Sequence, residues 1–144
     1  MSLNDIVRQY KCDYSENLPS QYDIKLAEEN IDINFGNQLM NYLSNYGYLG
    51  CGSVELFGLN SKQGLNSDLF EKTKYLNHYF EVTKGYIALE NINDSIYALL
   101  DSNDNVYIFN AQHSSIKALN IKLNDYIVKR FEGEENGRKI WKSN

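Results

Sequence analysis

The segment from Leu39 to Leu59 constrains the fold of this chain more than any other part of its sequence. Its first half carries apolar residues at the i, i+4 and i+7 spacing of one helix face: Leu39, Leu43 and Tyr46. Gly47 follows, and glycine readily takes the left-handed conformation in which many helices end. The aliphatic and aromatic residues of 54–57 are then typical of a strand. We therefore expect a helix that leads into a strand.

Two further helices are expected before this segment. Residues 3–10 predict a short helix. Ser20, with Asp23 three residues later, predicts the N-terminal capping box of a second helix, which ends near Asn30. Asn37 is expected to cap the next helix.

The second half of the chain alternates between helix and strand signals. Ser67 begins a helical pattern that Gly85 is expected to interrupt, and the closing helix has Gly133 as its predicted stop. Between them lie three runs rich in aliphatic and aromatic residues, which predict strands: 86–90, 96–100 and 106–109. The polar segment 101–105 predicts a tight turn, so the last two runs should form an antiparallel hairpin.

Helices, a meander of strands and a closing helix together predict an α+β fold, in which helices cover one face of an antiparallel sheet. A length of 144 residues suits one domain. We expect that domain to span residues 1–144, with its core over about 19–131 and a charged tail over 134–144.

Charge and hydropathy restrict the class of partner. The chain has 14 Lys and Arg against 19 Asp and Glu, a formal net charge of −5. This balance disfavours a nucleic-acid-binding protein, which needs clustered basic residues to neutralise phosphates, and it suits attraction to a basic protein. No segment resembles a signal peptide or reaches membrane-spanning length, so we expect a cytoplasmic protein that does not bind a membrane.

Residues that carry chemistry are few and scattered. Cys12 and Cys51 are too few for a disulfide framework and are interpreted as free thiols in a reducing cytosol. His78 and His113 match no zinc-ligand spacing, so we expect no metal and no cofactor. Either histidine beside a cysteine or a carboxylate would suit a small enzyme, but surface imidazoles are the favoured interpretation and no catalytic residue is assigned.

Carboxylate pairs and tyrosines offer two further kinds of site. The pairs Glu28–Glu29 and Asp101–Asp104 would support acid–base chemistry only if buried, and their polar contexts indicate solvated surface charge. Most tyrosines occupy core-facing or strand positions, which favours packing. Tyrosines near the surface would suit a protein-binding face, where this residue is enriched.

The order of these motifs resembles the SUKH superfamily, the Smi–Knr type of domain. The resemblance rests on Ala27-Glu28 in a helix, the apolar link 31–35, Tyr46-Gly47 at a helix end, the strand Glu55-Leu56-Phe57-Gly58-Leu59, and Thr73 in the next helix. It spans roughly residues 19–131. Gly36 departs from the pattern, because many members have proline there. A proline would pre-set the start of the helix, so glycine implies a looser junction.

The resemblance implies a non-enzymatic role carried by protein contacts. Bacterial relatives imply an immunity protein that neutralises a cognate toxin, often a nuclease or deaminase, and fungal relatives imply a regulator of cell-wall synthesis. The signature positions are expected to maintain the fold: Tyr46, Gly47, Glu55, Phe57, Gly58 and Thr73. Among them, Gly58 is expected at a close backbone approach and Glu55 in a buried hydrogen bond.

Our main hypothesis is a monomer or weak homodimer that occludes a basic, nuclease-type toxin with an acidic, tyrosine-bearing surface. The homodimer would use an exposed edge strand. The candidate contact residues are carboxylates: Glu28, Glu29, Glu90, Asp101 and Asp104. The alternative is an intracellular regulatory or adaptor domain that recognises another protein.

Overall fold

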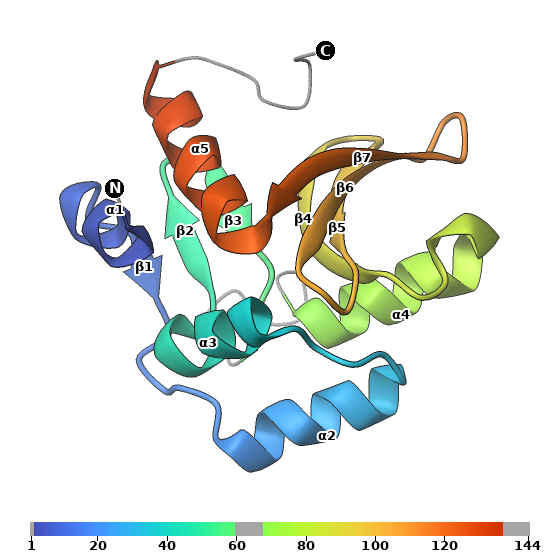
Figure 1. Cartoon of the computed structure of the whole chain (residues 1–144), viewed down its shortest axis with the longest axis horizontal. Coiled ribbons are helices and arrows are strands. Elements are labelled where there is room, and N and C mark those ends of the chain that lie inside the picture. Colours follow the sequence, from blue (N-terminus) through green and yellow to red (C-terminus); the bar gives the residue numbers. More distant parts are fainter. Residues whose placement is uncertain (1, 60–67, 137–144) are drawn as a thin grey trace.

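The computed structural model describes residues 2–59 and 68–136 of the 144 (Figure 1). Its helices are α1 (Leu3–Gln9), α2 (Gln21–Ile31), α3 (Asn37–Tyr46), α4 (Leu69–Tyr79), the short 3-10 helix η2 (Glu81–Thr83) and α5 (Leu123–Asn136). Its strands are β1 (Asp13–Tyr14), β2 (Leu49–Cys51), β3 (Val54–Leu56), β4 (Ile87–Asn93), β5 (Ile96–Leu100), β6 (Asn105–Asn110) and β7 (Ser115–Lys122).

The strands form two antiparallel sheets, and the α+β prediction is confirmed. The small sheet has the order β1-β2-β3, and the large sheet has the order β4-β5-β6-β7. The three predicted runs are β4, β5 and β6, and β5 and β6 form the predicted hairpin around 101–105. Strands β1, β2 and β7 were not predicted.

Helical elements lie against both faces of the large sheet, whereas we expected them on one face. Neighbouring residues of β5 point to opposite faces, so Tyr97 and Ala98 mark the two sides. Phe109 is paired with Tyr97, and the ring of Phe80, just after α4, packs edge-to-face on Phe109 with centroids 5.0 Å apart. Glu90 is paired with Ala98 on the other side, where α5 contacts it.

The predicted signals at the ends of α2 and α3 are mostly present. Ser20 and Asp23 form the capping box, in which the Asp23 amide donates to Ser20 Oγ at 3.1 Å. Gly47 follows α3 with a φ of +74°. Asn37, however, is not the cap of α3. Gly36 occupies the N-cap position, and it has no side chain with which to accept a hydrogen bond, so the acceptor must come from elsewhere.

Two predicted helix boundaries are wrong. α4 has Asp68 as its N-cap and ends at Tyr79, before Gly85 is reached. The predicted start, Ser67, lies outside the described residues. α5 continues past Gly133, so the glycine does not stop it.

The core begins earlier than the predicted 19–131 stretch. Ile6 and Val7 of α1 are buried in the same apolar cluster as Tyr126 and Ile127 of α5, and the two helices are in contact. At the other end, α5 takes in residues 134–136 of the predicted tail, and the remainder of that tail lies outside the described residues.

The prediction of two free thiols is wrong, because Cys12 and Cys51 form a disulfide with their Cα atoms 4.6 Å apart. The pairing of β1 with β2 brings them together, since Asp13 stands opposite Gly50. The bond closes a sequence separation of 39 residues around α2 and α3. The two strands are too short to be predicted, which is why the sequence did not reveal the pair.

The close backbone approach expected at Gly58 is present. Leu59 donates its amide to the carbonyl oxygen of Gly47 at 2.8 Å, which brings the two backbones together. A Cβ at position 58 would overlap that same carbonyl oxygen and would also crowd Tyr48. Glycine is therefore required here by space.

Among the remaining signature positions, Phe57, Thr73 and Tyr46 join separate elements of the fold. Phe57 donates its amide to the Leu89 carbonyl of β4 at 2.7 Å. Thr73 of α4 is buried, and its hydroxyl accepts the amide of Ala88, also in β4, at 2.9 Å. The hydroxyl of the buried Tyr46 donates to the side chain of Asn4 in α1. Glu55 lies on the exposed side of β3, so its predicted burial is wrong.

Candidate functional site

Glu90, predicted as a surface contact residue, is instead buried, with 1% of its surface exposed. Its carboxylate accepts the hydroxyl of Tyr126 at 2.5 Å and pairs with Nε of Arg130 at 3.1 Å. Burial raises the pKa of the Tyr126 hydroxyl well above its usual 10, and the adjacent Glu90 charge raises it further. Tyr126 therefore stays protonated and donates, and the trio joins α5 to β4 inside the core.

Asp104 is also buried, so the expectation of solvated charge is corrected here too. Its two carboxylate oxygens accept the amides of Gln38 and Leu39, each at 3.0 Å. These are amides of the first turn of α3, which have no partner inside the helix. An anion at a helix N-terminus is further favoured by the helix dipole. Asp104 is therefore the acceptor that Gly36 does not supply.

Gly36 makes room for this cap. A Cβ at position 36 would overlap the carboxylate of Asp104. We predicted that glycine would loosen this junction, but the absent side chain lets a carboxylate from the β5–β6 turn fix it.

The same turn also holds the start of α5. Leu123 donates its amide to the carbonyl oxygen of Asp104 at 2.9 Å, and Asn124 donates its amide to the side-chain oxygen of Gln38 at 2.8 Å. The N-termini of α3 and α5 therefore meet at one hairpin turn.

Asp101 is half-buried and organises that turn. It accepts the amides of Asn103 and Asn105, each at 2.9 Å, and the hydroxyl of Tyr107 at 2.9 Å. Partial burial by itself would raise the pKa of Asp101. The hydrogen bonds from Asn105, Asn103 and Tyr107 outweigh it and hold that pKa below its usual value.

Glu28 and Glu29 lie near the C-terminal end of α2 and differ in their surroundings. Glu28 is half-buried and accepts the amide of Phe35 at 2.7 Å, which fastens the link between α2 and α3. Glu29 is exposed. The five predicted carboxylates are thus not gathered into one patch, and Glu29 is the one that the structure leaves on the surface as expected.

Large apolar side chains are exposed at two places that sequence reasoning missed. Among residues 2–59 and 68–136, the exposed large apolar side chains are Tyr14, Leu18, Tyr22, Leu26, Tyr75, Tyr79 and Val82. One group lies on α2 and the chain before it, where Tyr22 is 72% exposed. The other lies on α4 and η2, where Tyr75 and Tyr79 stack at 4.9 Å. The available signal was that Tyr22 and Leu26 fall off the apolar stripe of Ile24 and Ala27.

The histidines do not meet the cysteines. His78 and His113 are both exposed, and His78 packs edge-on against Tyr79 at 4.6 Å. Over residues 2–59 and 68–136, no three His, Cys, Asp or Glu side chains lie close enough to share a metal ion. No helix in those same ranges combines the length and apolar character needed to cross a bilayer.

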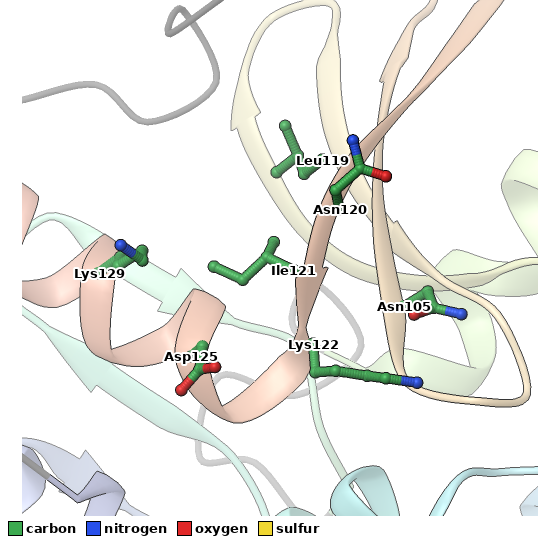
Figure 2. Close-up of a pocket in the computed structure, with 7 residues that line it drawn as sticks. All are labelled: Asn105, Leu119, Asn120, Ile121, Lys122, Asp125 and Lys129. Atoms are coloured by element: carbon green, nitrogen blue, oxygen red, sulfur yellow. The ribbon is translucent and has the colours of Figure 1, made fainter.

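A hollow of about 700 Å³ lies between β7 and α5. Figure 2 shows Leu119 and Ile121 on the side of β7 toward α5, while Lys122 reaches away from that helix. Lys122 Nζ donates to the Asn103 carbonyl oxygen in the β5–β6 turn at 2.8 Å. The described lining includes neither histidine nor cysteine: Asn105, Leu119, Asn120, Ile121, Lys122, Asp125 and Lys129. The asparagine amides and the lysine and aspartate charges that line the hollow are groups that water solvates, so we assign no ligand to it.

Comparison with models of protein families gives a match over most of the chain. Residues 3–132 match the family model SUKH_5, which is described as SMI1-KNR4 cell-wall. The match begins in α1 and ends within α5, so it includes both sheets. No curated protein matches the chain.

Proposed function

The chain belongs to the SUKH superfamily, and from this premise we propose that it is a protein-binding domain without catalytic activity. Its role is that of an immunity protein. It binds a cognate toxin made by the same cell, and it blocks the toxin by covering it. The family match over residues 3–132 is the observation that carries this proposal.

The surface of the molecule supports binding to a protein. Four tyrosines have half or more of their surface exposed: Tyr14, Tyr22, Tyr75 and Tyr79. Exposed tyrosines offer large, rigid contact area with a polar tip, and they are enriched at protein interfaces. A net charge of −5 favours a basic partner, such as a nuclease-type toxin whose own surface must attract nucleic acid.

The second candidate is a regulatory domain that acts through contacts with another cellular protein. It is favoured by the words SMI1-KNR4 cell-wall in the description of the matching family. Both functions use a binding surface, and they differ in the partner.

The direct test first asks whether a toxin gene lies beside the gene for this chain, as immunity predicts, and then uses the C-terminal domain of that toxin. We expect cells that express this domain to survive when the chain is co-expressed, and the two purified proteins to form a stable complex. Gly58→Val serves as the non-folding control, because its side chain would overlap the Gly47 backbone. If the wild-type chain neither rescues the cells nor binds the toxin domain, immunity to that toxin is ruled out and the regulatory function remains.

A further inference from the structure

We propose that the outward side of α2, with the linker before it, is the surface that docks on the basic partner. We call it the α2 face and define it by Leu18, Tyr22, Leu26 and Glu29. The inference rests on the proposed function and adds to it the place of contact.

The first observation is apolar exposure on a helix that is otherwise well packed. Ile24 and Ala27 bury the inner side of α2, which contacts α3 and α4. On its other side, Tyr22 and Leu26 are 72% and 42% exposed, and Leu18 in the linker is 45% exposed. Figure 1 shows α2 at the lower edge of the molecule, below α3 and α4, so its side away from these helices faces outward.

The second observation is where the charge lies. Residues 13–32 hold six acids (Asp13, Glu16, Asp23, Glu28, Glu29 and Asp32) and one base (Lys25), a net charge of −5. The whole chain has 14 basic and 19 acidic residues, also −5, so the rest of the sequence balances at 13 of each. The entire net charge of the protein is thus carried by the segment that also presents the exposed Tyr22 and Leu26.

The second group of exposed aromatics makes an informative contrast. Tyr75 and Tyr79 are 50% and 64% exposed, somewhat less than Tyr22, and the segment 68–84 around them has three acids and three bases, a net charge of zero. A basic partner would be attracted to both faces by apolar contact, whereas net charge favours only the segment 13–32, to which the α2 face belongs. An aromatic anchor surrounded by complementary charge is the arrangement expected where binding energy concentrates and encounter is steered.

Point variants separate the two contributions. Tyr22→Ala should raise the dissociation rate constant at least tenfold, since a central aromatic contact typically carries that much. Lys25→Glu should speed association at low salt and Glu29→Lys should slow it, each about two- to fivefold, with the differences shrinking as salt screens the charges. Asp23 and Glu28 are left intact because both hold α2 in place.

Matched controls lie elsewhere on the molecule. Tyr79→Ala removes a tyrosine that is 64% exposed on α4, and Lys117→Glu makes the same charge change as Lys25→Glu on β7. Circular dichroism first shows that each variant is folded. Association and dissociation rate constants are then measured for binding of each variant of the chain to the immobilised toxin domain.

The outcomes are distinct. Dissociation at least tenfold faster in Tyr22→Ala but not in Tyr79→Ala, with association rates that respond to residues 25 and 29 more than to residue 117, supports the α2 face. If wild type binds and all variants bind alike, the proposed function stands and the α2 face is wrong. Absence of wild-type binding overturns the function, and the inference with it. A homodimer of this chain that Tyr22→Ala dissociates would assign the face to self-association instead.

Discussion

Asp104 offers the sharpest test of how this fold is held together. Asp104→Asn leaves one acceptor oxygen for the two amides of Gln38 and Leu39, and we expect it to lower the free energy of unfolding by about 1–2 kcal/mol. Asp104→Gly removes both acceptors. Because the Leu39 amide is buried and the Gln38 amide half-buried, this loss should cost about 2–4 kcal/mol.

The backbone conformation at position 104 predicts a further difference in stability, between Asp104→Gly and Asp104→Ala. Its φ of +67° lies in the left-handed region, which asparagine and glycine accept and alanine does not. Asp104→Ala should therefore be less stable than Asp104→Gly by up to about 1 kcal/mol, despite the greater flexibility of a glycine in the unfolded chain. The expected order of stability is Asp, Asn, Gly and Ala.

Gly36→Ala provides the coupling test. In the wild-type background its methyl group overlaps the Asp104 carboxylate and should cost about 1–3 kcal/mol. In the Asp104→Gly background the carboxylate is gone, and the same substitution should cost much less. Urea unfolding followed by circular dichroism gives each value, with an unchanged m-value as the check that the states are comparable. Asp104→Ala within about 0.5 kcal/mol of wild type would refute the cap, as would an equal cost of Gly36→Ala in both backgrounds.

Three further predictions follow from other contacts. Gly58→Ala should abolish soluble expression because its Cβ meets the Gly47 backbone, whereas Gly50→Ala, whose nearest atom is at 3.8 Å, should fold; equal yields would contradict the close approach. Cys12→Ser with Cys51→Ser, or reduction of wild type, should cost about 2–4 kcal/mol in urea unfolding, and detection of free thiols in the denatured, unreduced protein would disprove the bond. Folding raises the pKa of Tyr126, so the folded protein favours the protonated hydroxyl. The contribution of Tyr126 to the free energy of unfolding is therefore complete below its unfolded-state pKa of about 10 and is lost as the pH rises above that value. Tyr126→Phe should reduce the loss of stability above pH 10 by about 1.4 kcal/mol per pH unit, and an unchanged slope would contradict this.

Features that depend on neighbouring residues were predictable from the sequence. The capping box of Ser20 and Asp23 spans three positions, and the stop at Gly47 needs only one residue to take an unusual conformation. The hairpin between β5 and β6 was visible for the same reason, since its turn is a short polar run between two apolar ones. Each of these signals involves only residues that are close together in the sequence, so the sequence alone is enough to predict them.

Features that depend on distant partners were not predictable. Glu90 and Asp104 looked like surface charge because their partners, Arg130 and Leu39, lie 40 and 65 residues away. Strand β7 was missed because a register shift against β6 interrupts its alternation, and Ile116 and Leu119 stand three positions apart rather than two. On α2, the sequence identified the acid Glu29 but not the exposed apolar residues beside it.

The contact of the N-termini of α3 and α5 at the β5–β6 turn also limits when the protein can finish folding during its synthesis. The amide of Gln38 must wait for an acceptor 66 residues downstream, and the Gln38 side chain in turn waits for an amide 86 residues downstream. A nascent chain that stops short of residue 104 therefore holds α3 without its terminus secured. We expect such truncated chains to be recognised as unfinished and to be degraded by proteases, with stable structure emerging only near the end of translation.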